Sequence, residues 1–355
     1  MSNRFCFRIT FLAVAILSGF YNNAAAQIGG SSTYAFLNLS SSARIAALGG
    51  KLVPVKDNDL NLVFANPAVL NPTMDHQLTF SGVGYFAGIR YGYAAYASEI
   101  KKAGMFSAGM HYVDYGHFDE TDETGEVTGS FKAGEYSLNL TWAKQLADSA
   151  FSFGVTLKTI YSSLESYTSY GLAADLGANY YIEPAMVNLS LVAKNAGRQL
   201  KAYREGNIEP LPFEVELGVS KQLAKAPFRF SLILQHLEKP DMTFTDPAKE
   251  GQLDPITGEP LDQKITTGDK ILRHVILGTE LLISKNFNVR FGYNFQRRKE
   301  LGVDTKMGTT GLSWGFGFRI SKFIFSYGRS TYHLAGASNS FSISANLNEF
   351  VKKQD

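Results

Sequence analysis

Six histidines are the side chains of this sequence best suited to bind a metal or to act in acid–base catalysis near neutral pH. They are scattered, and no two form His-Glu-x-x-His or another metal-binding spacing: His76, His111, His117, His236, His274 and His333. Asp114 and His117 are close enough in sequence to suggest a catalytic pair at a strand end. An ordinary loop contact explains that pair better, so the histidines predict neither a metal site nor an active site.

Three further runs could carry chemistry. Ser98-Glu99-Ile100-Lys101 fits a Ser-x-x-Lys nucleophile motif, but the chain has no Ser-Asp-Asn or Lys-Thr-Gly companion, so we expect a charged turn. The acidic run 119–126 offers oxygen ligands for calcium without the spacing of a calcium loop, which favours a solvated loop. Arg297-Arg298-Lys299 is too short for a nucleic-acid patch, although a contact with a lipopolysaccharide phosphate stays open. We therefore predict a non-enzymatic protein with no catalytic residue, metal or cofactor.

Composition narrows the class of protein. The formal net charge is +2, and the first 26 residues carry two arginines and no acid, so the rest of the chain is neutral. A neutral chain has no field with which to collect nucleic acid. Charged residues make up only 19%, against roughly 25% in soluble domains, and aromatic residues reach 13%. These values argue against disorder and against a charged helical protein.

Residues 1–26 have the pattern of a secretory signal peptide. Arg4 and Arg8 form a positive region, Ile9 to Phe20 is apolar, and three alanines ending at Ala26 form a cleavage site. A membrane helix is the alternative, but this apolar core is too short. The only cysteine, Cys6, precedes the apolar region, so the mature chain is expected to contain no disulfide, thiolate metal site or lipidated cysteine.

The remaining chain is rich in short segments that alternate apolar and polar residues. In 135–142, for example, Tyr136, Leu138 and Leu140 point one way while Ser137 and Asn139 point the other. Period-two alternation predicts β-strands with one apolar face. We expect fourteen strands, beginning near residues 77, 88, 103, 134, 150, 168, 186, 212, 227, 273, 287, 311, 322 and 339.

The lengths of the connections distinguish a barrel from a β-sandwich. Connections after even-numbered strands are short: 98–102, 148–149, 182–185, 222–226, 285–286 and 321. Four of those after odd-numbered strands are long: 114–133, 195–211, 237–272 and 298–310. An outer-membrane barrel sorts its loops in this way, with short periplasmic turns and longer outer loops, whereas a sandwich does not. We predict an all-β fold, a transmembrane antiparallel barrel of about 14 strands over 77–350, with a tail at 351–355.

The less apolar face of these strands carries charges that hydrocarbon would not tolerate, so it should line a wet or plugged lumen. The charges are of mixed sign, which favours a paired network over an ion-selective ring: Glu135, Lys158, Asp175, Glu214, Glu216, Arg229, Glu280, Arg290 and Arg319. Glycines on the same face leave room for something inside: Gly154, Gly278, Gly292, Gly315 and Gly317.

Residues 27–76 precede the first strand and do not alternate. Ser40-Ser41-Ser42 should cap a short helix over 43–48 that ends at Gly49-Gly50, and Asn66 should cap a turn that begins with Pro67 and Ala68. We predict a hatch that plugs the lumen; a periplasmic arm is the alternative. If the hatch is inside, Arg44, Lys51 and Lys56 need partners among the lumen acids.

This segment resembles a known family. Phe36-Leu37-Asn38-Leu39, Ser42-Ala43-Arg44, Ala47-Leu48-Gly49-Gly50 and Ala65-Asn66-Pro67-Ala68 resemble the N-terminus of the PorV/PorQ family of the Bacteroidetes type IX secretion system. The run Gly29-Gly30-Ser31-Ser32-Thr33-Tyr34 is closer to the PorQ branch. The Asn-Pro-Ala element also resembles the hatch motif of FadL-type transporters, which have fourteen-stranded barrels. The chain departs from outer-membrane barrels in lacking a terminal aromatic residue, because five residues follow Phe350.

The resemblance implies a subunit of the outer membrane that contacts lipid and lipopolysaccharide and belongs to an attachment complex with PorZ, PorV and PorU. That complex processes secreted cargo and anchors it to lipopolysaccharide. A FadL-like transporter of hydrophobic small molecules is the alternative function. In the connection 237–272, four prolines accompany apolar residues that could dock a partner: Met242, Phe244, Leu253, Ile256 and Leu261. A lid folded over the barrel mouth is the alternative for this loop.

The order of long and short connections predicts the orientation of the barrel. Single cysteines at Asp122 and Pro255 should react with a membrane-impermeant thiol reagent in whole cells, because both lie in outer connections. A cysteine at Lys101 should react only after the cells are opened. Labelling of Lys101 alone in intact cells would reverse the orientation.

Overall fold

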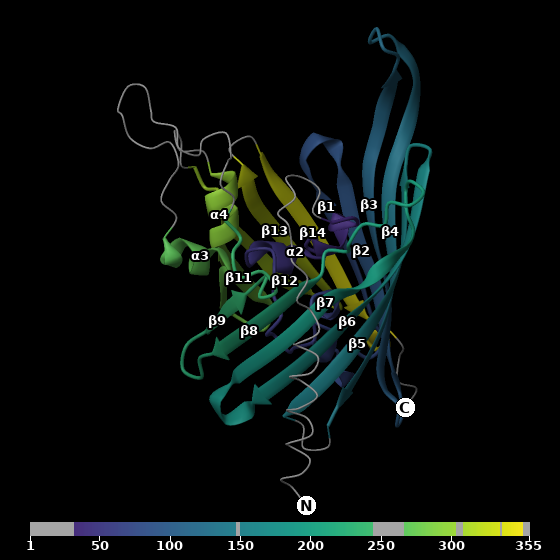
Figure 1. Ribbon diagram of the computed structural model, residues 1–355. Coiled ribbons are helices and arrows are strands. Elements are labelled where there is room, and N and C mark those ends of the chain that lie inside the picture. The colour runs from purple at the N-terminus through teal and green to yellow at the C-terminus, as the bar shows by residue number, and fades with distance from the viewer. Residues whose placement is uncertain (1–31, 147–149, 244–265, 303–307, 334–335, 351–355) are drawn as a thin grey trace, which may run out of the picture. The chain divides into compact units, whose positions relative to one another are not determined.

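The computed structural model describes residues 32–146, 150–243, 266–302, 308–333 and 336–350. In this part, fourteen strands form one closed barrel in which neighbours in sequence pair antiparallel and β1 pairs with β14 (Figure 1). The strands are β1 Gln77–Gly84, β2 Arg90–Ile100, β3 Gly104–Thr121, β4 Val127–Gln145, β5 Phe151–Leu164, β6 Tyr167–Ile182, β7 Val187–Lys201, β8 Glu214–Gln222, β9 Phe228–Leu234, β10 Val275–Leu281, β11 Phe287–Asn294, β12 Leu312–Ile320, β13 Phe323–His333 and β14 Gly336–Asn346. The predicted fold class is confirmed.

The two faces of the wall follow the predicted alternation. In β4, Leu138 and Leu140 are about half exposed, whereas Ser137 and Asn139 between them are buried. The same pattern recurs around the barrel, so its outer surface is apolar and its inner surface is polar. This arrangement reverses that of a protein folded in water, because the apolar face is the one left uncovered.

Two predicted loops are wrong in part: β7 continues to Lys201, into the predicted connection 195–211, and the connection 114–133 is almost wholly strand. Residues 114–133 were expected to be a loop, but β3 and β4 continue through them as a long hairpin that turns at 122–126 (Figure 1). Phe118 and Phe131 stack across this hairpin with their ring centroids 5.3 Å apart. Strands outside a membrane need no apolar face, so the alternation that marks a strand is lost there.

Two helices interrupt the long connections late in the chain. α3, Thr267–Arg273, lies in the connection between β9 and β10, and α4, Phe295–Leu301, follows β11 directly. They contact each other, and Lys299 forms an ion pair with Asp269 at 2.8 Å. Of the candidate partner residues, only Met242 is described; Phe244, Leu253, Ile256 and Leu261 lie outside the described residues. No helix in the described part is long and apolar enough to cross a membrane.

The N-terminal segment forms short helices inside the barrel: the 3-10 turns η2 Ala35–Asn38, η3 Leu60–Phe64, η4 Pro67–Val69 and η5 Pro72–Met74, and the α-helix α2 Ala43–Ala47. The predicted caps are present. Ser42 Oγ accepts a hydrogen bond from Ile45 N at 3.3 Å, and Asn66 Oδ1 accepts one from Ala68 N at 2.9 Å. The signal peptide at 1–26 and the tail at 351–355 lie outside the described residues. Three further 3-10 turns lie at strand ends: η6 Phe86–Gly88, η7 Glu183–Ala185 and η8 Leu347–Glu349.

The segment touches opposite parts of the wall. α2 lies against β11 to β14, and η4 lies against β4 to β6. Apolar residues of the segment, such as Leu48, Leu62 and Phe64, form one buried cluster with inward-facing Tyr93 and Ile276. A second cluster joins Tyr34, Phe36 and Leu37 to inward-facing residues that include Tyr91 and Val113. The lumen therefore has an apolar core, which the sequence pattern of the strands did not predict.

Glycines in the wall allow the backbone of the segment to approach it. A β-carbon placed on Gly154 would lie 2.4 Å from the carbonyl of Pro67, and one on Gly292 would lie 2.3 Å from the backbone of Leu48 and Gly49. These are impossible contacts with backbone atoms, so only glycine fits at either position. Gly317, also expected to make room for the hatch, faces the side chains of Arg290 and Asn288 instead.

We expect Gly154→Val to displace the segment, because the new side chain occupies the position of the Pro67 carbonyl. Overpacking of this kind costs about 1–3 kcal/mol, so the folded barrel should melt at a lower temperature in detergent and residues 32–76 should become sensitive to protease. Gly82→Val is the matched control, because a β-carbon at Gly82 meets no atom within 4 Å. Equal behaviour of the two variants would contradict the observed contact.

Candidate functional site: the plugged lumen

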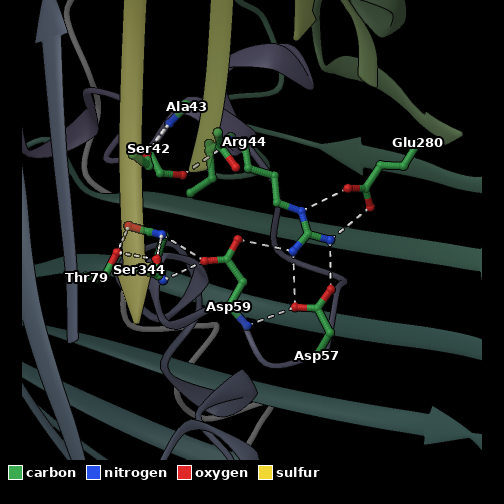
Figure 2. Close-up of polar contacts among 12 residues, drawn as sticks. Ser42, Ala43, Arg44, Asp57, Asp59, Thr79, Glu280 and Ser344 are labelled. Atoms are coloured by element: carbon green, nitrogen blue, oxygen red, sulfur yellow. Dashed lines mark hydrogen bonds and ion pairs between the residues drawn. The ribbon is translucent and has the colours of Figure 1, made fainter. Parts of the chain in front are cut away.

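Arg44 is the centre of the contact between the N-terminal segment and the wall (Figure 2). Its side chain is 6% exposed and lies between Glu280 of β10 and two acids of its own segment. Arg44 Nε and Nη2 donate to the two oxygens of Glu280 at 2.9 and 3.0 Å. Arg44 also donates to both oxygens of Asp57 at 3.1 and 2.8 Å, and to Asp59 at 3.2 Å. All its donor nitrogens are therefore bonded to carboxylates.

Two wall arginines extend this cluster. Arg229 of β9 bridges Asp57 and Glu280, with both contacts at 3.0 Å. Arg290 of β11 donates to Glu280 at 3.2 Å. We call Arg44, Arg229, Arg290, Glu280, Asp57 and Asp59 the arginine cluster. It contains as many arginines as carboxylates, and it joins three strands to the segment.

The charges of this cluster stabilise one another. Burial disfavours the charged form of Arg44, but attraction by Asp57 and Glu280 outweighs it and raises the pKa of Arg44 well above its usual range. Burial likewise opposes ionisation of Asp57, but Arg44 and Arg229 hold the pKa of this carboxyl well below its usual range. Both groups are therefore charged when the segment is in place.

A second cluster holds the segment at Lys51. Its ammonium forms an ion pair with Glu214 and lies 3.1 Å from Glu216, both of β8 and both buried. Burial opposes the charge on Lys51, yet the attraction of Glu216 and Glu214 raises its pKa. Lys194 of β7 lies 3.9 Å from Glu216 and faces the ring of Phe64. Lys51 therefore has the acidic wall partners that the sequence predicted for it.

The other lumen charges are paired within the wall. Lys158 of β5 is buried, contacts Asp175 of β6 at 2.7 Å and donates to Asn195 at 2.8 Å. Glu135 accepts a hydrogen bond from Tyr115 at 2.5 Å. Lys158 also contacts the segment, because its ammonium lies over the ring of Phe64, 5.3 Å from the centroid. The lumen is a paired network, as expected from its mixture of signs.

The Asn66-Pro67-Ala68 element lies against the wall on the far side from α2. Asn66 is fully buried, and its Nδ2 donates to Val53 O at 2.9 Å while its Oδ1 caps the following turn. Ala68 O accepts a hydrogen bond from Ser152 of β5 at 2.8 Å. Gly49 and Gly50 end α2 with φ angles of +96° and +98°, which favour glycine. The Asn66-Pro67-Ala68 element and the two glycines therefore set the path of the backbone in the segment.

Arg319, predicted in the lumen, stands at its end: it lines the same small cavity as Arg44 and Glu280, is 37% exposed and pairs with Glu349 at 2.6 Å. The expectation for Lys56 is wrong. Lys56 makes no ion pair among the described residues, and burial lowers its pKa. Sequence reasoning also missed Asp57 and Asp59, although two acids one residue apart near Arg44 were a visible signal.

Buried His111 is a further feature that the sequence did not reveal. It lies at the centre of β3 among aromatic rings, with the ring centroid of Phe64 at 4.8 Å and that of Phe36 at 5.6 Å. Neither of its ring nitrogens has a hydrogen-bond partner in the described part of the chain. His111 is therefore a packing residue of the lumen core.

The other chemical runs make local contacts. Asp114 accepts a hydrogen bond from Gly116 N at 2.9 Å, and no bond to His117 is seen in the described chain. Asp122 Oδ1 accepts hydrogen bonds from Thr124 N and Glu126 N, so it shapes the tip of the hairpin.

Ser98 and Glu99 belong to β2, not to the turn predicted there. Arg297 lies over the ring of Tyr332, 4.0 Å from its centroid. Within the described residues, no group of His, Cys, Asp and Glu is arranged to hold a metal.

A cavity of about 160 Å³ adjoins the arginine cluster. Its lining includes Arg44, Glu280 and Arg290 of the cluster, and Lys285 and Asn286 in the turn between β10 and β11. Most of the lining is polar or charged, and a few residues, such as Phe318, are apolar. It is suited to water or a small ion, and it lies at the end of the lumen where the short turns are.

Comparisons with known proteins bear on the fold. The solved structure of the Ralstonia pickettii toluene transporter TbuX is similar, with a TM-score of 0.52 and 12% sequence identity over 87% of this chain and 99% of TbuX. A Pseudomonas aeruginosa FadL homologue matches with a TM-score of 0.44 and 11% identity over 86% of this chain and 97% of the homologue. The fold is therefore similar to that of TbuX. No protein-family profile and no curated sequence matches the chain. Nothing in these comparisons supports the PorV/PorQ resemblance.

We expect Arg44→Ala to loosen the segment, because it leaves Glu280, Asp57 and Asp59 with less positive charge around them. Breaking a buried ion pair costs about 3–5 kcal/mol, so the variant should melt earlier and pass more ionic current in a planar bilayer. Lys270→Ala, which breaks an exposed pair with Asp241, is the control and should change neither. An unchanged melting temperature and an unchanged current in Arg44→Ala would contradict a role for the arginine cluster in holding the segment.

Asp57 also predicts how stability depends on pH. Its pKa in the folded protein lies below the ordinary value of 3.8, so its contribution is complete above that value and is lost as the pH falls further. The melting temperature of the wild type should therefore drop steeply below about pH 4. Asp57→Asn should melt earlier at neutral pH and show a shallower acid drop, whereas Asp119→Asn at an exposed position should keep the wild-type profile. An unaltered acid drop in Asp57→Asn would rule out this contribution.

Proposed function

We propose that this protein is an outer-membrane β-barrel, exported by its signal peptide, whose N-terminal segment closes the lumen without any enzymatic activity. The observation that carries this proposal is the distribution of residues across the barrel wall: apolar residues face outward, while the arginine cluster lies inside. Hydrocarbon can surround such an outer surface, and a closed barrel leaves no strand edge unpaired in it. The fold similarity to TbuX supports the same placement.

Passage of small hydrophobic molecules is the finer function that the comparisons favour. TbuX is a toluene transporter, and this chain matches nearly its whole length. The apolar cluster around Tyr34, Phe36 and Tyr91 would give such molecules a surface inside the lumen. Because the segment fills the lumen, transport requires it to move, and the arginine cluster would then act as the latch.

A reversible tether tests this function. The mature chain is predicted to lack cysteine, so a pair at Ala43 and Ser342, which are joined by a 2.9 Å hydrogen bond, can link α2 to β14. Oxidation should stop toluene uptake by whole cells, and reduction should restore it. Each single-cysteine variant is a matched control for oxidation itself. Uptake that continues with the tether closed would exclude transport through a moving segment.

The second candidate is a platform for surface proteins in the type IX attachment complex, with PorZ, PorV and PorU as partners. The N-terminal motifs favour it, since they resemble the PorV/PorQ family, and a segment latched by buried ion pairs suits a permanently closed barrel. The tethered barrel should then still co-purify its partners. Replacing 240–262 with a short Gly/Ser linker should remove them if that loop docks them, while shortening the 119–128 hairpin tip is the comparison. Full recovery of partners with both changes would place docking elsewhere.

A further inference from the structure

An apolar groove lies on the outer face of the wall where the barrel closes. It has a volume of about 750 Å³ and runs across β1, β14 and β13 to the neighbouring strands. Its apolar lining includes Phe80, Tyr112, Phe325, Tyr327 and Phe341. This volume is within the roughly 300–1,000 Å³ typical of small-molecule sites. No residue of the arginine cluster lines the groove, although Ser326, which accepts a hydrogen bond from Arg290 at 3.2 Å, does.

The groove exists because small residues meet in two adjacent strands. Gly82 of β1 pairs with Gly92 of β2, and Phe80 pairs with Ala94. Phe341 stands opposite Gly82, whereas the ring of Tyr112 lies over Gly92, where a β-carbon would be 2.8 Å from Tyr112 Cε1. A β-carbon on Gly82 would meet no atom within 4 Å, so the floor of the groove is open. Its shape is therefore built into the sequence of these strands.

One end of the groove is basic. Two residues beyond the glycine pair, Arg329, Asn339, Gly84 and Arg90 form a row across β13, β14, β1 and β2. Arg329 donates to Asn339 at 3.0 Å, and neither it nor Arg90 forms an ion pair among the described residues. Asp114 is the strand partner of Arg90, and Trp314 is that of Arg329. Arginine and tryptophan at one level are typical of a membrane interface.

The spacing of the two arginines limits what they can bind. They are three strands apart, which at 4.7–4.9 Å per strand separates their backbones by about 14 Å. One phosphate cannot readily bridge that span, whereas two phosphates on one headgroup can each meet a guanidinium. The row lies at the end of the barrel with the connection 85–89, which is the outer end in the proposed orientation.

We propose that this groove binds a bisphosphorylated glycolipid of the outer leaflet. One acyl chain lies over Gly82 and Ala94, and the two phosphates approach Arg90 and Arg329. The inference rests on the proposed outer-membrane location only for the source of the lipid. The site itself is defined by the groove and the row of arginines, so it can be tested on purified barrel in detergent.

The test is binding of diphosphoryl lipid A to delipidated barrel, measured by native mass spectrometry. We expect one molecule of diphosphoryl lipid A per barrel. Monophosphoryl lipid A should bind about fivefold more weakly, and lipid A without phosphate should bind about fivefold more weakly again. Gly82→Phe should abolish binding by filling the floor. Arg90→Gln with Arg329→Gln should weaken diphosphoryl lipid A at least tenfold and remove the preference for phosphate.

Matched variants on the far wall separate these effects from general changes. Ala178→Phe adds the same ring to an outward position of β6, and Arg198→Gln removes an exposed arginine of β7; both should bind as the wild type does. Equal binding of phosphorylated and dephosphorylated lipid, or no effect of Gly82→Phe, would overturn the proposal. So would a photo-crosslinker at Gly82 that captures a protein in place of lipid. Fractionation of cells tests the outer-membrane location separately.

Discussion

A buried arginine with all its donors satisfied is the interaction on which the rest of the interior depends. Arg44 is held by Glu280 of the wall and by Asp57 and Asp59 of its own segment. An ionised side chain out of water is stable only with such partners. The segment therefore supplies both charges of the Arg44–Asp57 and Arg44–Asp59 pairs and one charge of the pair with Glu280, and it must bend back on itself to do so. That bend places Asp57 where Arg229 can also reach it.

Alternate residues of each strand face two different environments, the surroundings of the barrel and its lumen. Outward residues such as Leu138 suit hydrocarbon, while inward Lys158 and Asp175 are buried against each other. The segment adds a third component, because its leucines and Phe64 supply the apolar surface that the inward faces lack. Because these ion pairs are buried beside an apolar plug, the local dielectric constant is low, which strengthens each of them.

Closure and possible movement follow from the same contacts. The segment is anchored at α2, at Lys51 and at the Asn66 turn, which lie against different parts of the wall. Movement of one anchor without the others would break buried ion pairs. It would also press the backbone of the segment against the backbone of the wall, because at positions such as Gly154 the wall has no side chain that could move aside. A transporter would have to release these anchors together, and a platform would keep them. The two proposed functions thus differ in whether the ion pairs that hold the segment open during function, as in a transporter, or stay closed, as in a platform.

The sequence by itself determined the barrel, because period-two alternation and strand length depend only on local residue order and on the thickness of a membrane. It also determined the caps at Ser42 and Asn66, which are local hydrogen bonds. It failed on 114–133, where strands leave the membrane and lose the pattern. Only the tertiary structure decided which acids meet Arg44, why Gly292 must be glycine and where Gly82 and Gly92 meet. Those contacts join residues distant in the chain, and their geometry is set by barrel closure and strand register.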